Sequence, residues 1–143
     1  MFAVAATGPT RVSAAEDDRA ISAGRWRVVA VEMGGKTLEP EFVSMLSVLY
    51  GADGAWAVLF KSIVVAEGSS TIDPSADPKA FEMKTLGPAR APDSGWRYSG
   101  IYEMHGNSRR LCAGPAGKPR PATFSTTRRN GQILVTLERI TTP

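Results

Sequence analysis

The side chains best suited to catalysis in this chain of 143 residues are one histidine, one cysteine and a few carboxylates. His105 is the sole histidine, so a catalytic triad or a histidine-based metal site would have to use it. It stands beside Gly106 in a segment typical of a tight turn, and the chain holds no Gly-x-Ser-x-Gly nucleophile motif. We therefore expect His105 to be an exposed turn residue.

Cys112 is the only cysteine, which excludes an internal disulfide and a structural zinc cluster. Arg110 lies two positions earlier on the same strand face and would stabilise a thiolate, but free cysteine is more often a buried packing residue. Glu103 and Glu138 could serve glycoside hydrolysis only if they met across a site, and strand glutamates usually pair with Arg or Lys. The sequence predicts no catalytic residue, no metal and no cofactor. A small hydrolase using Glu103 or Cys112 is the weakest alternative.

Aromatic and basic side chains point instead to binding. Three aromatic residues alternate along one face of an expected strand at 95–104, where they would either line a cavity or fill it. Two basic residues lie next to prolines, and a cation inside a barrel would need a partner such as a carboxylate. The predicted ligand-binding residues are Trp96, Tyr98 and Tyr102 as walls and Lys79, Arg120 and Glu103 as polar groups.

The overall charge argues against two other classes of partner. The net charge is +3, and the basic residues are scattered or paired, whereas a nucleic-acid-binding protein concentrates them on one element. We interpret the pairs Arg109–Arg110 and Arg128–Arg129 as solvated hairpin tips. No apolar run approaches the ~18 residues that span a bilayer. The sequence therefore predicts no nucleic-acid partner and no membrane span, and it leaves the oligomeric state open.

Residues 1–20 form a segment of separate character. A short apolar stretch at 2–6 and small residues at 12–15 resemble the end of a secretory signal with cleavage after Ala14 or Ala15, followed by acidic residues. A disordered alanine-rich tail is the alternative. Either interpretation leaves residues 1–20 outside the fold and makes 21–143 the folded domain, and the signal-like stretch predicts a periplasmic or secreted protein.

The rest of the chain consists of short β-rich runs separated by Gly, Pro, Asn and Asp. One helix is expected at 39–46, although 45–50 could instead begin the second strand. Asn130-Gly131 is a strong hairpin signal between the last two runs. The other expected strands are 25–33, 55–65, 67–73, 79–84, 95–104, 109–113, 122–127 and 132–140. This regular spacing predicts an all-β protein with a single closed or nearly closed antiparallel barrel of about eight strands, with a sandwich as the alternative.

A set of motifs resembles one family. Gly24-Arg25-Trp26 opens the first strand as G-x-W, and the wider matching stretches are GRWRVVAVEMGGK (24–36), DPKAFEM (77–83), GIYEMHGNSRRLC (100–112), KPRPATFST (118–126) and LER (137–139). They resemble small lipocalin-like domains known mainly from planctomycete bacteria, with a departure at residues 105–108. The resemblance implies a calycin-like barrel and export, with Gly24, Trp26 and Arg139 as structural residues and Arg139 stacked on the indole. It gives no information about catalytic activity.

The sequence thus predicts an exported, non-enzymatic, lipocalin-like domain that holds a small apolar or amphipathic molecule in its barrel. The main alternative is a filled barrel whose outer face or loops at 87–95 and 114–121 bind a protein or a cell-envelope polymer.

Overall fold

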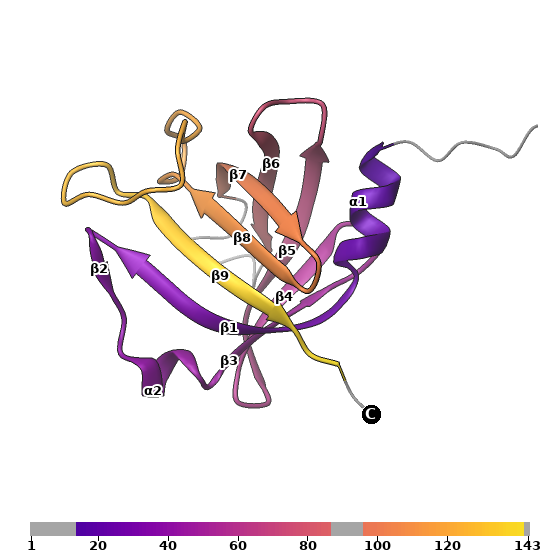
Figure 1. Ribbon diagram of the computed structural model, residues 1–143, viewed down its shortest axis with the longest axis horizontal. Helices are drawn as coiled ribbons and strands as arrows, with labels where there is room; N and C mark the ends of the chain where they lie inside the picture. The colour runs from indigo at the N-terminus through magenta and orange to yellow at the C-terminus, as the bar shows by residue number, and fades with distance from the viewer. Residues whose placement is uncertain (1–13, 87–95, 142–143) are drawn as a thin grey trace, which may run out of the picture.

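A computed structural model describes residues 14–86 and 96–141 as nine β-strands and two short helices (Figure 1). The helices are α1 (Ala14–Ser22) and α2 (Pro40–Val43). The strands are β1 (Gly24–Met33), β2 (Lys36–Thr37), β3 (Leu46–Tyr50), β4 (Ala55–Phe60), β5 (Ile63–Asp73), β6 (Lys79–Leu86), β7 (Arg97–His105), β8 (Ser108–Ala113) and β9 (Ile133–Arg139).

Eight of the strands close into a ring. Each strand from β3 to β8 pairs antiparallel with the next, and β1 pairs with both β3 and β9. The short strand β2 pairs only with the end of β1 and lies outside the ring. The closed ring confirms the predicted antiparallel barrel and shows that the chain does not form two stacked sheets.

Strand β1 closes the barrel because it is long enough to serve two partners. Residues 24–27 pair with β3, and residues 26–33 pair with β9. The register against β9 shifts between Val28 and Ala30, which marks a β-bulge at Val29. A bulge bends a strand and increases its twist, so β1 can curve from one neighbour to the other.

The run at 55–65 is not the single strand that the sequence predicts. It turns at Lys61 and Ser62, so β4 ends at Phe60 and the remaining residues begin the long strand β5. Lys61 occupies the positive-φ position of this turn (φ 59°), a conformation that Gly or Asn usually marks in sequence. The turn therefore lacks its usual signal.

The expected strand at 122–127 is also wrong, and with it the expected final hairpin. Residues 114–132 form a long loop, and β9 pairs with β8 and β1 instead. Asn130 does make a turn, with its side-chain oxygen accepting from the amides of Thr127 and Gln132, but this turn joins no pair of strands. Prolines in this segment lack the amide donors that a strand ladder needs.

The helices differ from expectation in length and number. Only Pro40–Val43 is helical within the expected helix at 39–46, and β3 begins at Leu46, in agreement with the alternative reading of 45–50 as strand. Helix α1 (Ala14–Ser22) includes residues 14–20, which the sequence analysis leaves outside the fold, and it lies against the barrel (Figure 1). No helix in the described part of the chain is long and apolar enough to span a bilayer.

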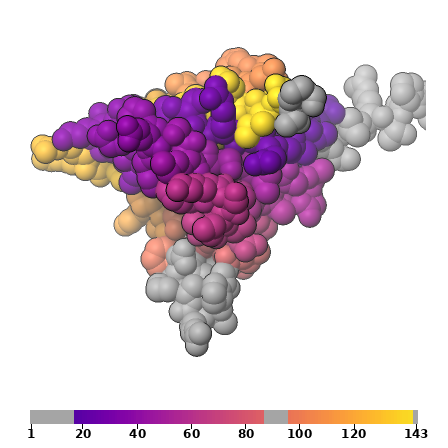
Figure 2. Space-filling view, turned by 90° about the horizontal axis from the view of Figure 1, so that it is seen from below, coloured from indigo at the N-terminus to yellow at the C-terminus, as the bar shows by residue number. Residues whose placement is uncertain are grey.

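The buried residues gather into two clusters inside the barrel. One surrounds Trp26 and Leu137, both fully buried, and the other joins Phe81, Tyr102 and Ala113. Seen from below, α2 and the strands of the first half of the chain, in purple to magenta, form much of the surface (Figure 2). The two clusters leave an unfilled volume between them, which is the candidate site.

Candidate functional site

The interior of the barrel holds a largely apolar cavity of about 440 Å³. All eight strands of the ring contribute to its wall, because alternate residues of each strand point inward. Val48 on β3, Met83 on β6 and Leu111 on β8 are typical of this wall. The volume lies within the ~300–1,000 Å³ of small-molecule sites. The barrel is therefore hollow, and the filled interior assumed by the interaction-module alternative is not observed.

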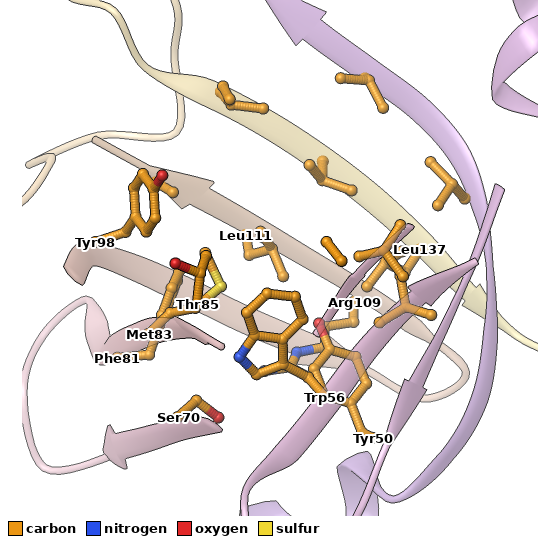
Figure 3. A pocket seen from close by; sticks show the side chains of 18 of the residues that line it. Tyr50, Trp56, Ser70, Phe81, Met83, Thr85, Tyr98, Arg109, Leu111 and Leu137 are labelled. Atoms are coloured by element: carbon orange, nitrogen blue, oxygen red, sulfur yellow. The ribbon is translucent and has the colours of Figure 1, made fainter. Parts of the chain in front are cut away.

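Polar side chains are few, and they lie toward both ends of the cavity. Tyr50 and Arg109 lie together with Trp56 at one end, while Tyr98 lies at the other (Figure 3). The ring nitrogen of Trp56 donates to the carbonyl of Ser69 at 3.0 Å, so its polar edge is already satisfied. Arg109 is the charged group of the wall.

Arg109 is almost fully buried, with 5% of its surface exposed. Its guanidinium carbon lies 4.3 Å from the ring centre of Tyr50 and 5.4 Å from that of Tyr102, so two aromatic rings hold the cation. Its Nε and Nη1 atoms have no hydrogen-bond partner among the described residues. The end of the cavity thus presents a buried cation with unused donors.

Helix α1 covers this end of the barrel through a buried carboxylate. Asp18 is 7% exposed, and its Oδ2 accepts hydrogen bonds from the hydroxyl of Tyr102 at 2.7 Å and from Nζ of Lys79 at 3.0 Å. Burial, followed by this hydrogen bond, raises the pKa of Tyr102, so the hydroxyl stays protonated and donates. The hydrogen bonds of Asp18 therefore join α1 to Lys79 on β6 and to Tyr102 on β7.

A second, smaller cavity of about 20 Å³ lies between α1 and the barrel. Arg19 and Ser22 of α1 line it from one side, and Tyr50, Ser70 and Arg109 line it from the other. Nε of Arg19 is buried and has no hydrogen-bond partner within the described segments. Arg109 lines both cavities and so stands at their boundary.

The predicted stacking of Arg139 on Trp26 is present beside this end. The guanidinium carbon of Arg139 lies 4.4 Å from the ring centre, and the indole nitrogen donates to the carbonyl of Ser22 at 2.8 Å. Arg139 also donates to the carbonyls of Ala23 and Ile21. Gly24 has a positive φ of 120°, which suits a glycine at the entry to β1. These contacts fix α1 to the closing strands.

The structure separates the predicted ligand-binding residues. Tyr98 lines the cavity, whereas Trp96 is 49% exposed and is absent from its wall. Tyr102 points inward but is only 1% exposed, and its hydroxyl and Lys79 are both bound to Asp18. These two residues therefore hold the end of the barrel, and neither forms the cavity wall.

The other two predicted polar groups lie on the outer face. Glu103 pairs with Arg110 at 2.7 Å and lies 3.6 Å from the ring nitrogen of His105. Arg120 binds Glu82 and donates to the carbonyl of Gly100 at 3.2 Å, which holds the 114–132 loop against β6 and β7. Neither Glu103 nor Arg120 reaches the cavity.

The candidate catalytic residues are also placed away from the cavity. Cys112 is fully buried beneath the 114–132 loop, with its sulfur 3.7 Å from the carbonyl of Ser125. Burial raises the pKa of this thiol, which is the opposite of what a nucleophilic cysteine needs. His105 is an exposed residue at the β7–β8 turn. The loop at 87–95 lies outside the described residues.

Sequence reasoning missed Arg109, Tyr50 and Trp56. Arg109 was assigned to a solvated hairpin tip together with Arg110, but only Arg110 faces outward. Alternation along Ser108–Ala113 could have found it, because Arg109 shares its face with Leu111 and Ala113.

The fold and the site define a closed eight-stranded β-barrel with an apolar internal cavity and a buried cation at one end. Comparisons of the chain with family models, curated proteins and solved structures find no match. The resemblance to planctomycete lipocalin-like domains therefore stays a prediction.

Proposed function

We propose that this protein is a lipocalin-like binding domain that holds a small apolar or amphipathic molecule inside its barrel. The observation that carries the proposal is the cavity of about 440 Å³, whose wall is formed mainly by aliphatic and aromatic side chains. Filling an apolar cavity with an apolar ligand is favourable by about 25 cal/mol per Å² of apolar surface removed from water. The signal-like N-terminal stretch supports export as part of the same proposal.

Two variants, each of which replaces an alanine with phenylalanine, test where a ligand binds. Ala66 lines the cavity on β5, and Ala57 is on the neighbouring strand β4, at a position absent from the cavity wall. Ala66→Phe should reduce the affinity for the neutral fluorescent probe N-phenyl-1-naphthylamine at least about tenfold, because the added ring occupies ligand space. Ala57→Phe adds the same ring outside the cavity and should leave the affinity unchanged.

Fluorescence titration measures both affinities, and circular dichroism shows whether each variant is folded. Ala113→Leu, a smaller change at another cavity position, replaces Ala66→Phe if that variant does not fold. Absence of saturable probe binding to the parent protein, or equal weakening by Ala57→Phe, would overturn the proposal and favour the interaction-module alternative. If the parent protein does bind the probe inside the barrel, native mass spectrometry of protein purified from its own host should identify the natural ligand.

A further inference from the structure

Two arginines at the α1 end of the barrel, Arg19 and Arg109, have no acidic partner among the described residues. The carboxylate of Asp18 already accepts from Lys79 and from Tyr102. Arg109 has no carboxylate oxygen within 4.0 Å among the residues described, and Arg19 forms no ion pair there either. Arg19 and Arg109 therefore meet at the small cavity, and neither forms an ion pair with a carboxylate of the described residues.

Arg109 needs a partner as a cation, because a guanidinium keeps its charge in proteins. The rings of Tyr50 and Tyr102 attract the cation through their faces, but they accept no conventional hydrogen bond from Nε and Nη1. A buried charge is normally paired and hydrogen-bonded, so the missing partner should be a group that enters the cavity.

We infer that the molecule held in the barrel is a carboxylic acid with an apolar tail, and that Arg109 binds its carboxylate. This inference rests on the proposed function and adds the chemical class of the ligand. Arg109 lies where the cavity ends, so the tail extends from it between the aliphatic walls of β3 and β8 toward Tyr98 (Figure 3). The head group is thus at the covered end and the tail points away from it.

The adjoining small cavity favours a carboxylate over a larger anion. Its volume of about 20 Å³ has room for one water-sized group, which matches a single carboxylate oxygen. An oxygen there would lie beside Arg19 and Arg109, whose guanidinium groups can both donate, whereas the hydroxyl of Ser22 already donates to the carbonyl of Asp18. With one oxygen in this space, a carboxylate leaves one further oxygen in the largely apolar main cavity, whereas a phosphate ester leaves at least two.

Ligands with one chain length and three head groups test the inference. Dodecanoic acid, dodecan-1-ol and dodecyl phosphate share the same tail, so differences in their affinity report the head group. We expect dodecanoate to displace N-phenyl-1-naphthylamine from the parent protein with at least about tenfold higher affinity than the alcohol, as a charge-assisted hydrogen bond implies. This comparison needs no variant and does not depend on the folding of one.

Two neighbouring arginines then provide the matched variants. Arg109→Met should reduce dodecanoate affinity to that of the alcohol while leaving the alcohol affinity within about twofold. Arg110→Met removes the same charge from the next residue, which faces outward and pairs with Glu103, and it should change neither affinity. Circular dichroism should show that both variants keep the barrel.

The outcomes separate the two proposals. If the protein binds neither the probe nor any of the dodecyl compounds, the proposed function itself is overturned. Equal affinity for acid and alcohol overturns the anionic head group but leaves the barrel as a binder of neutral apolar molecules. Tighter binding of dodecyl phosphate than of dodecanoate overturns the assignment of a carboxylate head group. A preference for dodecanoate that persists in Arg109→Met overturns the role of Arg109.

Discussion

The contact between Arg139 and Trp26 predicts that these two side chains stabilise the barrel cooperatively. Trp26 is fully buried, and the guanidinium carbon of Arg139 lies 4.4 Å from its ring centre. The two residues come from β1 and β9, whose pairing closes the ring at Trp26 and Arg139. A double-mutant cycle with Trp26→Leu and Arg139→Met measures this coupling.

The size of each effect follows from the contacts that are lost. Trp26→Leu removes the indole hydrogen bond to Ser22 and leaves a partly refilled cavity, so we expect a loss of about 2–4 kcal/mol. Arg139→Met removes the ring contact and the hydrogen bonds to the carbonyls of Ala23 and Ile21, at about 2–3 kcal/mol. The double variant should cost about 1 kcal/mol less than the sum, because the ring contact is counted in both single changes.

Urea unfolding followed by far-ultraviolet circular dichroism suits this cycle, because a change at Trp26 alters the fluorescence. Arg27→Met is the matched control, since Arg27 is the next residue on β1 and forms an exposed ion pair with Glu138. Such pairs contribute at most about 1 kcal/mol, and Arg27→Met should combine additively with Trp26→Leu. Additivity within about 0.3 kcal/mol for Arg139→Met as well would refute the coupling.

Three further outcomes follow from single residues. Cys112 should remain unreactive toward Ellman's reagent until the protein unfolds, because burial raises the pKa of its thiol; rapid labelling of the native protein would contradict this. Gly68→Ala should lower the free energy of unfolding, measured in urea, by more than about 1 kcal/mol, since a Cβ there would overlap the carbonyl oxygen of Lys84. Hydrogen bonds from the hydroxyl and then the amide of Ser75 lower the pKa of Asp73, so this group favours the folded state above its ordinary pKa and loses that effect as the pH falls through the lowered value. Ser75→Ala should raise the pKa of Asp73 in an NMR titration of its carboxyl carbon, and an unchanged value would count against the bond.

The barrel itself could be predicted from sequence because its information is local. Alternation fixes which face of each strand points inward, and the Gly106-Asn107 turn joins β7 to β8. The failures concern segments whose structure depends on distant contacts. Thr126 illustrates this, because its hydroxyl donates to Glu32 and accepts from the amide of Gly35, which holds the 114–132 loop in place without a strand.

Less of the candidate site than of the fold could be predicted from the sequence, because the site also depends on distant contacts. Tyr98 was placed correctly by alternation, but the roles of Tyr102 and Lys79 depend on Asp18, which comes from a helix that the sequence analysis left outside the domain. A sequence shows that a residue is charged, and it does not show which distant carboxylate neutralises it. The lack of hydrogen-bond partners for Nε and Nη1 of Arg109 can be recognised only in the structure.

The position of Arg109 is best explained by a compromise between stability and binding. A buried charge without a partner disfavours the folded state, and an apolar residue of similar volume is often neutral or stabilising at such a place. Arg109→Met should therefore leave the unliganded protein as stable as the parent or more so, while abolishing the extra stabilisation that dodecanoate gives by mass action. Strong destabilisation by Arg109→Met would mean that packing between Tyr50 and Tyr102 is the role of this side chain. There would then be no physical reason to expect a ligand carboxylate, because the two aromatic rings would already stabilise the guanidinium of Arg109.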